Sequence, residues 1–463
     1  MMSKATRRTF MKAILAAGAV PAVIPSGVVR AQDGRPTPAN RTTFALIGCG
    51  WMGPDGVFGN LIQNKDTQVI AGCDVFKSRR EKFANRVNEH YGTKGCEAVA
   101  DFQALLTRKD LDCVYIATPE HWHVAMAMLA IRNGKDVYVE KPLSTGVNWS
   151  RILRAEVQKR KAVFQFGTWQ RSQRHFRKAC EMVRNGIIGD VKRVETWSTG
   201  SNVIWGDIND PNSDMGQRHV GGLTPQEVPA DLEDFDAWLG PAPAAFYSHA
   251  RTRWYCVPDY CLGFISNWNI HPVDIAQWGL GTDHTVPVAY KGTCQWPSIR
   301  GICETPIGWD VTCRYANGIE LRKMDTKTAE PIITQYRPNN DHGTTFFGEK
   351  GWLSVDRGTV YMSDRNIKWD KIEWKDSDTK LFASAQDNQW HGFIDSVRTR
   401  KPTVNPIESA FNGDLICHLA SIAAISGREV KWDAKEEKLV GNADLAMHLS
   451  RTAREPWGKL MEG

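Results

Sequence analysis

The chain has 463 residues, of which 42% are hydrophobic and 24% are charged. This is an ordinary globular composition, and it excludes a disordered, collagen-like or coiled-coil chain. At roughly 150 residues per domain, the length favours two or three domains. The formal net charge is +6, but five positive charges precede Gln32 in a stretch without acids, so the remainder carries only +1. The basic balance therefore gives no reason to expect a nucleic-acid partner.

The N-terminus has the pattern of an export signal. The segment TRRTFMK at residues 6–12 precedes a 17-residue, mostly apolar run that contains two prolines. No apolar run reaches the roughly 18 residues of a membrane-spanning helix, so no membrane span is expected. The pattern resembles the bacterial twin-arginine signal, with a small-residue cleavage site ending at Ala31. It predicts a signal peptide over 1–31, the twin-arginine translocase as a partner during export, and a periplasmic location. An amphipathic N-terminal helix is the alternative.

Cysteine usage gives no metal or disulfide framework. The eleven cysteines have no regular spacing and include no C-x-x-C pair. A zinc site is therefore not expected, and most of the thiols should be buried. Disulfide formation after export stays open.

A dinucleotide-binding pattern follows the export segment. The apolar run 44–47 leads into GCGWMG at 48–53, and a helix is expected from Pro54 to Asn64. A second strand over 69–73 ends in Asp74, which is 21 residues beyond Gly53. Such glycines let the backbone approach a pyrophosphate, and the strand-end acid binds the adenosine ribose. Asp74 favours NAD, while the basic residues at 77, 79 and 80 leave NADP possible.

Strands and helices continue to alternate up to about residue 168. Further strands are expected at 112–117, 136–139 and 163–166. The pattern predicts an α/β Rossmann domain with a doubly wound parallel sheet and a site at the strand C-terminal ends. Thr118, Pro119, His121, Lys141 and Gln170 lie at such ends. His121 and His123 lack metal-ligand spacing, so no metal is expected.

Beyond Trp169 the predicted strands and helices no longer alternate regularly. Strands without regular helices between them are expected at 191–198, 288–293, 309–314, 319–323, 343–347, 352–355 and 359–362. Helices are expected at 389–399 and 407–426, and residues 235–259 should form a loop over the substrate. This is an α+β pattern with one sheet.

Several motifs together resemble the Gfo/Idh/MocA oxidoreductase family. They are the loop 48–53, Asp74, ATPEHWH at 117–123, EKP at 140–142, WLGPAP at 238–243, HPVD at 271–274, FGEKGW at 347–352 and REPW at 454–457. The resemblance implies a Rossmann domain over 43–168 and a substrate and oligomerisation domain over 169–457. The latter would contain a large, open, mostly antiparallel sheet. It also implies NAD(P), a sugar or cyclitol substrate, and a homo-oligomer.

The resemblance assigns the chemistry to Lys141 and His271. In the family, the lysine of Glu-Lys-Pro reaches the reacting hydroxyl, and the histidine of a D-x-x-x-H segment is the base or proton relay. Here the position four residues before His271 is Asn267, which cannot titrate. Asp274 either assists these groups or orients a substrate hydroxyl.

The remaining predicted contacts are divided between cofactor and substrate. Predicted cofactor contacts are Gly48, Gly50, Trp51, Met52, Gly53, Asp74, Thr118, Pro119, His121, Glu140, Lys141 and Gln170. Predicted substrate contacts are Asn267, Asp274, Trp169, Arg171, Arg253, Trp254 and Tyr260.

The favoured function is oxidation of a ring hydroxyl of a sugar or glycoside, with C3 the sharpest version, by hydride transfer to tightly bound NAD(P). Two alternatives stay open. One is a redox glycosidase that oxidises, eliminates, adds water and reduces. The other is a non-catalytic sugar sensor.

Overall fold

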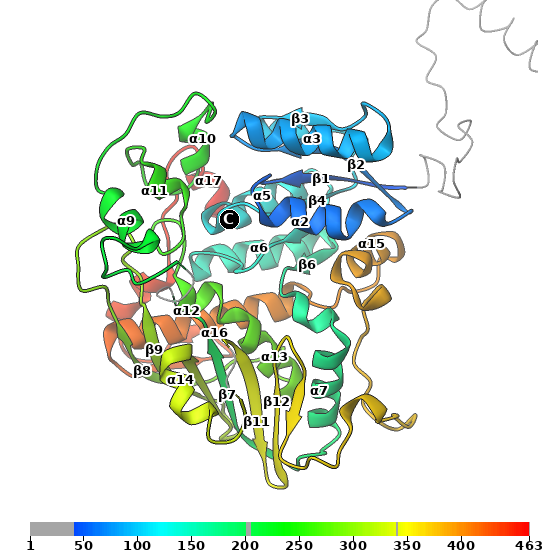
Figure 1. Cartoon of the computed structure of the whole chain (residues 1–463), viewed down its shortest axis with the longest axis vertical. Coiled ribbons are helices and arrows are strands. Elements are labelled where there is room, and N and C mark those ends of the chain that lie inside the picture. Colours follow the sequence, from blue (N-terminus) through cyan, green and yellow to red (C-terminus); the bar gives the residue numbers. More distant parts are fainter. Residues whose placement is uncertain (1–40, 201–204, 339–340, 463) are drawn as a thin grey trace, which may run out of the picture. The chain divides into compact units, whose positions relative to one another are not determined.

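The computed structural model describes residues 41–200, 205–338 and 341–462, and the chain from Thr42 onwards forms one compact unit. The predicted signal peptide over 1–31 lies outside the described residues. Two sheets form within the unit, one from the first part of the chain and one from the second (Figure 1).

The first sheet is parallel and has six strands in the order β3-β2-β1-β4-β5-β6. Its strands are β1 (Thr42–Ile47), β2 (Thr67–Cys73), β3 (Glu97–Val99), β4 (Cys113–Ile116), β5 (Asp136–Val139) and β6 (Phe164–Phe166). The central strands β4 and β5 are buried along their whole length, as expected for strands covered on both faces. The predicted doubly wound fold class is confirmed.

Helices connect these strands. They are α2 (Met52–Gly59), α3 (Lys77–Tyr91), α4 (Phe102–Leu106), α5 (Glu120–Arg132) and α6 (Val147–Arg160). The helix expected to reach Asn64 ends earlier, at Gly59, and a 3₁₀ turn, η3 (Leu61–Gln63), follows. Asn60 leaves helical geometry at φ −141°, directly after a glycine that weakens the helix.

The second sheet has nine strands in the order β13-β12-β11-β7-β10-β9-β8-β14-β15. Its strands are β7 (Val191–Ser198), β8 (Ala289–Gln295), β9 (Gly308–Arg314), β10 (Glu320–Asp325), β11 (Gly343–Gly348), β12 (Gly351–Val355), β13 (Val360–Met362), β14 (Val430–Asp433) and β15 (Lys438–Leu439). All neighbours are antiparallel except β7 and β10, so the predicted open, mostly antiparallel sheet is confirmed.

Helices in this part are more numerous than predicted. They are α7 (Arg174–Arg184), α9 (Asp214–Gly221), α10 (Phe235–Leu239), α11 (His249–Thr252), α12 (Phe264–Asn267), α13 (Ile270–Leu280), α14 (Thr326–Ile333), α15 (Gln389–Thr399), α16 (Ile407–Ser426) and α17 (Gly458–Met461). The expectation that no regular helix separates the strands is wrong, and the segment 235–259 contains two short helices. Side-chain caps from Asp234, Ser248 and Asp325 begin three of these helices, a signal that hydrophobic periodicity does not contain.

Helix α16 joins the two sheets. It is apolar and buried on nearly every side, and it contacts α6 from the first part as well as β8 and β9. In Figure 1 it lies between the two sheets. Its Asp414 accepts hydrogen bonds from the Leu143 backbone N–H (3.2 Å) and the Ser150 hydroxyl (3.0 Å). These hydrogen bonds fix the segment that begins at Leu143. This segment follows Lys141, whose peptide bond to Pro142 is cis.

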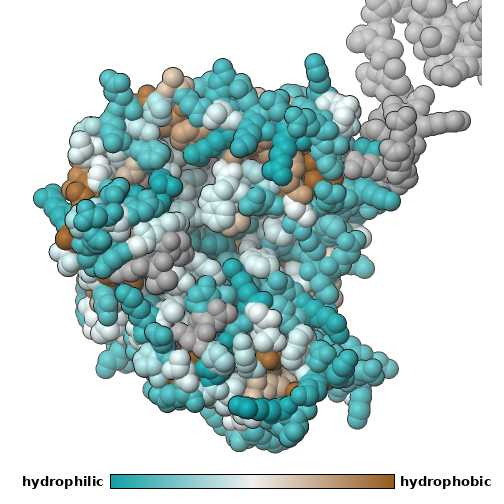
Figure 2. Space-filling view, viewed as in Figure 1, coloured by the Kyte–Doolittle hydropathy of each residue, from teal (hydrophilic) through white to brown (hydrophobic). Residues whose placement is uncertain are grey.

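The surface is mostly polar. Hydrophilic residues dominate the face in Figure 2, where apolar ones are scattered. Among the described helices, none has both the length and the apolar character to span a bilayer.

The packing of α13 against β11 yields a first prediction. A Cβ at Gly279 would lie 2.5 Å from Cζ of Phe346, which is fully buried. Gly279→Ala should therefore reduce the free energy of unfolding by about 1–3 kcal/mol. In a Phe346→Leu background the same change should cost less, because the shorter side chain removes the clash. Equal costs in the two backgrounds, measured by denaturant unfolding, would contradict this packing.

Candidate active site

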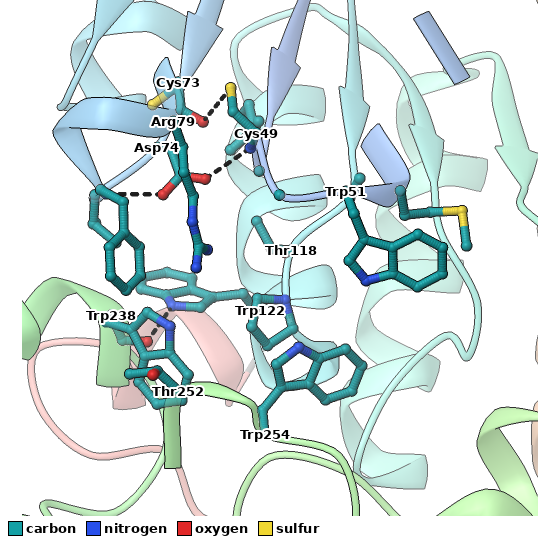
Figure 3. A pocket seen from close by; sticks show the side chains of 18 of the residues that line it. Cys49, Trp51, Cys73, Asp74, Arg79, Thr118, Trp122, Trp238, Thr252 and Trp254 are labelled. Atoms are coloured by element: carbon teal, nitrogen blue, oxygen red, sulfur yellow. Dashed lines mark hydrogen bonds between the residues drawn. The ribbon is translucent and has the colours of Figure 1, made fainter. Parts of the chain in front are cut away.

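A cavity of about 1150 Å³ opens at the C-terminal ends of the parallel strands. One side consists of the turns after β1, β2, β4 and β5, and the other consists of residues between 205 and 267. Ligands bind at this edge in open α/β sheets. Figure 3 shows the indoles of Trp51, Trp122 and Trp254 in this cavity.

The glycine turn after β1 is built for close backbone approach. Gly48 has φ +97°, and a Cβ there would lie 2.5 Å from the Ala117 carbonyl oxygen. Gly53 does not line the cavity; a Cβ there would lie 2.5 Å from the Gly48 oxygen. Gly50, by contrast, has nothing within 4 Å of its Cβ position and faces open space. Together with Trp51 and Met52, which line the cavity, this turn fits a pyrophosphate.

Asp74 lies beside this turn at the end of β2. Its carboxylate accepts hydrogen bonds from the Cys49 backbone N–H (2.7 Å) and the Phe76 backbone N–H (2.9 Å), and Figure 3 shows its place next to Arg79. Burial raises the pKa of Asp74, while these two N–H groups and Arg79 oppose the rise. The position is that of a ribose-binding acid, and the glycine cradle with Asp74 fits a pyridine dinucleotide.

Of the three basic side chains considered for a 2′-phosphate, only Arg79 lines the cavity. Its guanidinium lies 3.9 Å from the centre of the Phe76 ring. Lys77 is 4.0 Å from Glu81, and Arg80 is 2.5 Å from Glu233.

Besides Gly53, two predicted cofactor contacts, His121 and Gln170, lie outside the cavity lining, whereas Thr118, Pro119, Glu140 and Lys141 are part of it. His121 is buried against the rings of Trp238 and Tyr260, and burial lowers its pKa to about 3. It therefore supports the wall opposite the sheet and does not face a nucleotide. Gln170 is buried as well, and its side-chain amide has no hydrogen-bond partner among the described residues.

Lys141 lies where the two parts of the molecule meet. Its Nζ donates hydrogen bonds to the backbone oxygen and to Oδ1 of Asn267, both at 3.1 Å. Burial lowers the pKa of Lys141; the carboxyl groups of Glu140 and Glu120 oppose this, and Arg357 adds to it. A lysine held in this way has more free amine at neutral pH than an exposed one.

Glu120 completes this arrangement, and we did not predict it as a site residue. It is the first residue of α5 and is almost fully buried, and its Oε1 accepts a hydrogen bond of 2.5 Å from Nδ2 of Asn267. Burial raises the pKa of Glu120 to about 8, against the lowering effects of Asn267 and Lys141. The available sequence signal was an acid at the first position of a helix that begins at a strand end.

His271 approaches the same region from α13. It is buried, its ring packs at 5.4 Å from that of Trp268, and its Nδ1 has no partner among the described residues. Burial lowers its pKa well below the ordinary value, and the charges of Lys141 and Arg357 lower it further. His271 is therefore a neutral imidazole close to Lys141, although it does not line the large cavity.

Arg171 and Asp274 do not reach the cavity, contrary to our expectation of substrate contacts. Arg171 donates to Asp274 and to Asp283, with the shortest contact to each at 2.7 Å, and Thr168 donates to Asp274 at 2.8 Å. The side chains of Arg171 and Asp274 are 1% and 2% exposed. A buried arginine and a buried acid satisfy each other here, which leaves neither available to a ligand.

The other predicted substrate contacts divide. Tyr260 is buried against His121 and Trp238, so the structure does not place it at a ligand either. Arg253 and Trp254 line the cavity together with Asn267. Trp169 is partly exposed and faces Arg357.

No group of His, Cys, Asp and Glu in the described ranges has the arrangement of a metal site. All eleven cysteines are described, and none of them forms a disulfide.

Two family models match the chain. Residues 42–168 match the Gfo/Idh/MocA model described as "Oxidoreductase family, NAD-binding Rossmann fold", and residues 213–329 match "Oxidoreductase family, C-terminal alpha/beta domain". Together the two matches cover more than half of the chain.

Curated relatives match mainly over part of their length. The chain is 31% identical over 204 residues to a "Glycosyl hydrolase family 109 protein" of Saccharopolyspora erythraea, covering 40% of this chain and 44% of that one. It is 29% identical over 154 residues to an inositol 2-dehydrogenase of Rhodococcus jostii, covering 33% and 40%. The chain thus spans less than half the length of either relative.

Solved structures share the fold. GenD2 from gentamicin A biosynthesis, in complex with NAD, has a TM-score of 0.59 at 17% identity, covering 88% of this chain and 100% of that chain. Aldose-aldose oxidoreductase from Caulobacter crescentus, complexed with glycerol, also has a TM-score of 0.59 at 17% identity, covering 84% and 99%.

The buried ion pairs of Arg171 yield the second prediction. Arg171→Met leaves two carboxylates, Asp274 and Asp283, without their cation, which should cost about 3–5 kcal/mol of unfolding free energy. The control is Arg322→Met, which breaks an equally short pair with Asp310 whose side chains are 33% and 35% exposed. It should cost at most about 1 kcal/mol. Equal losses in thermal or denaturant unfolding would show that Arg171 does not stabilise the fold through these acids.

Proposed function

This chain belongs to the Gfo/Idh/MocA oxidoreductase family, and we propose that it oxidises a ring hydroxyl of a sugar or glycoside, at C3 in the most specific form, with tightly bound NAD. The observation that carries the proposal is the position of Lys141. It lines the cavity with the glycine turn, and Asn267 from the second part of the chain holds its amine.

When bound, the nicotinamide would accept the hydride from the carbinol carbon. The backbone of residues 48–52 would hold the pyrophosphate, and Asp74 would hold the adenosine ribose. The chain itself must remove the hydroxyl proton, and a neutral amine or imidazole can do so. Burial lowers the pKa of both Lys141 and His271, which increases the fraction of each that is free to accept a proton.

Asn267 affects which group can offset the positive charge of protonated Lys141. It replaces the aspartate of the family pattern, so it cannot itself offset the charge of protonated Lys141. Glu120 provides a carboxyl group on the other side of the Asn267 amide instead. When this carboxyl group is ionised, it favours the ammonium that forms when Lys141 takes the hydroxyl proton.

The proposal extends to location and assembly. We propose that the twin-arginine pattern exports the folded chain to the periplasm, so the nucleotide is loaded before export and stays bound. We also propose a homo-oligomer through the open sheet.

A redox glycosidase is the second candidate, favoured by the likeness to the family 109 glycosyl hydrolase. Cleavage of an aryl glycoside without net NADH formation would support it over a dehydrogenase. A sugar sensor would bind its ligand without either reaction.

The third prediction tests the role of Lys141. With NAD-loaded protein and a panel of sugars and glycosides, Lys141→Ala should reduce turnover by about 10²–10⁴-fold, because the base is lost. Binding of NAD, followed by fluorescence of the bound nucleotide, should stay close to that of the unmodified protein. Unchanged turnover would contradict the proposed enzymatic reaction. An unmodified protein without affinity for NAD would contradict the whole proposal.

The fourth prediction concerns pH. The Glu120 carboxylate raises the pKa of Lys141. Glu120→Gln keeps an acceptor for Asn267 but removes the carboxylate that forms as the pH rises toward about 8, so the pKa of Lys141 should fall. The rise of kcat/KM with pH should therefore move to lower pH, by about one unit or more. Adding Asn267→Asp puts a carboxylate directly against Nζ and should move the profile back up.

The control for this series is Glu156→Gln on the neighbouring helix α6. Glu156 is a buried glutamate that contacts Arg132 and Arg160 and does not line the cavity. It should leave the pH profile in place. A lower rate without a shifted profile in Glu120→Gln would mean that Glu120 acts only through structure.

A further inference from the structure

Arg357 is a charged side chain that the described residues compensate only in part, through the carboxylate of Asp341. It lies between β12 and β13 and is only partly exposed. It forms neither an ion pair nor a hydrogen bond with any described residue, and its buried Nε has no partner. Burial lowers its pKa to about 10, so it remains a cation at neutral pH. A guanidinium that is half-buried without an ion pair or hydrogen bond costs stability, even with Asp341 nearby, which calls for a functional explanation.

Two indoles hold this guanidinium. Its Cζ lies 4.8 Å from the Trp169 ring centre and 4.5 Å from that of Trp268. Stacking of this kind fixes the plane of an arginine without using its N–H groups. The donors of Arg357 therefore remain available in a defined orientation.

The same Trp268 ring brings two histidines near Arg357. His271 lies 5.4 Å and His342 5.0 Å from it, centre to centre. Nδ1 of His271 and Nε2 of His342 are buried without partners among the described residues. Nδ1 of His342 is already engaged, at 2.5 Å from Asp341. The positive charge of Arg357 also lowers the pKa of both Lys141 and His271, so the cluster adjoins the proposed reaction centre.

This cluster offers a cation and two imidazole rings. Its one carboxylate, Asp341, acts on Arg357 electrostatically but forms no ion pair with it among the described residues, and it engages His342 instead. Since Arg binds carboxylates through two parallel N–H groups, the natural complement is an acid from outside the chain.

We propose that Arg357, stacked between Trp169 and Trp268, binds a carboxylate of the substrate, which makes the substrate an acidic sugar such as a uronate. The proposal rests on the oxidation proposed above, because it places the acid group beside Lys141 and His271. His271 and His342 complete the subsite as hydrogen-bonding groups, and Lys141 stays free to take the hydroxyl proton.

The experiment compares binding of D-glucuronate with D-glucose, and of D-galacturonate with D-galactose, by calorimetry on NAD-loaded protein. Each acid should bind at least about tenfold more tightly than its neutral counterpart, as expected for a charge-assisted hydrogen bond. Arg357→Gln should remove this preference while leaving binding of the neutral sugars unchanged. Arg357→Lys should keep part of it, because the charge remains but the paired donors do not.

Arg193→Gln is the matched control. Arg193 also lies over an aromatic ring of the same sheet, 4.2 Å from the centre of Phe347, but it has Glu195 at 3.4 Å as a counter-ion. It should keep the full acid preference. Retention of NAD by Arg357→Gln shows that the variant is folded, and if that variant loses NAD, Arg357→Lys provides the comparison.

The outcomes separate the two proposals. An acid preference in the unmodified protein without NADH formation would support the subsite and contradict the oxidation. Oxidation of neutral sugars with no acid preference would support the oxidation and contradict the subsite. Inorganic phosphate that displaces the uronates equally well in both proteins would mean that Arg357 is not the anion site. A panel in which no acid binds better than its neutral partner would overturn the proposal.

Discussion

The hydrogen bonds from the Lys141 amine to Asn267 are the contact on which the site depends. Lys141 reaches the edge of the parallel sheet because β5 ends there, and Asn267 belongs to α12, which precedes the helix that carries His271. Neither part alone forms the site. Helix α16 holds them together, because Asp414 binds the segment after Lys141 while the same helix covers the second sheet. A change in this packing would separate the amine from its partner before it altered either sheet.

Around this contact the chain buries an unusual number of titratable groups. Burial pushes Glu120 and Glu140 toward their protonated forms, and it pushes Lys141 and His271 toward their neutral forms. All four groups therefore move in the direction that reduces charge in the site. Such opposed shifts are what a proton-transfer site needs, since the acid and base forms become similar in free energy near neutral pH. Burial lowers the pKa of Arg357 as well, but only to about 10, so this side chain stays charged and stands out as the group that requires an outside partner.

Local sequence patterns predicted the parts of the site that a single turn determines. The glycine turn, Asp74 and Lys141 each follow directly from a strand and its end, and the structure places them at one edge. The pattern could not predict pairings between distant segments. Arg171 and Asp274 were predicted to contact a substrate, yet each removes the other from solvent. From the sequence, Glu120 was only the first residue of a helix. Its role in the site depends on its hydrogen bond with Asn267, which is 147 residues away. The short capped helices between 235 and 259 were missed for a related reason, since four- and five-residue helices have too few positions to show a period.

Asn267 and Glu120 together show how a site can keep a carboxyl group near its lysine after a substitution. The family pattern places a carboxylate on the second part of the chain, four residues before the histidine. Here that position holds an amide, and the carboxyl group lies on the first part, at the N-terminus of α5, where burial raises its pKa. The Asn267 amide donates a hydrogen bond to Glu120 and accepts one from Lys141. It therefore orients both groups but transfers no proton between them. Lys141 then senses a more distant charge than an adjacent aspartate would provide, and its amine is correspondingly easier to deprotonate. This arrangement favours a base that works near neutral pH, at the cost of a weaker hold on the proton it accepts.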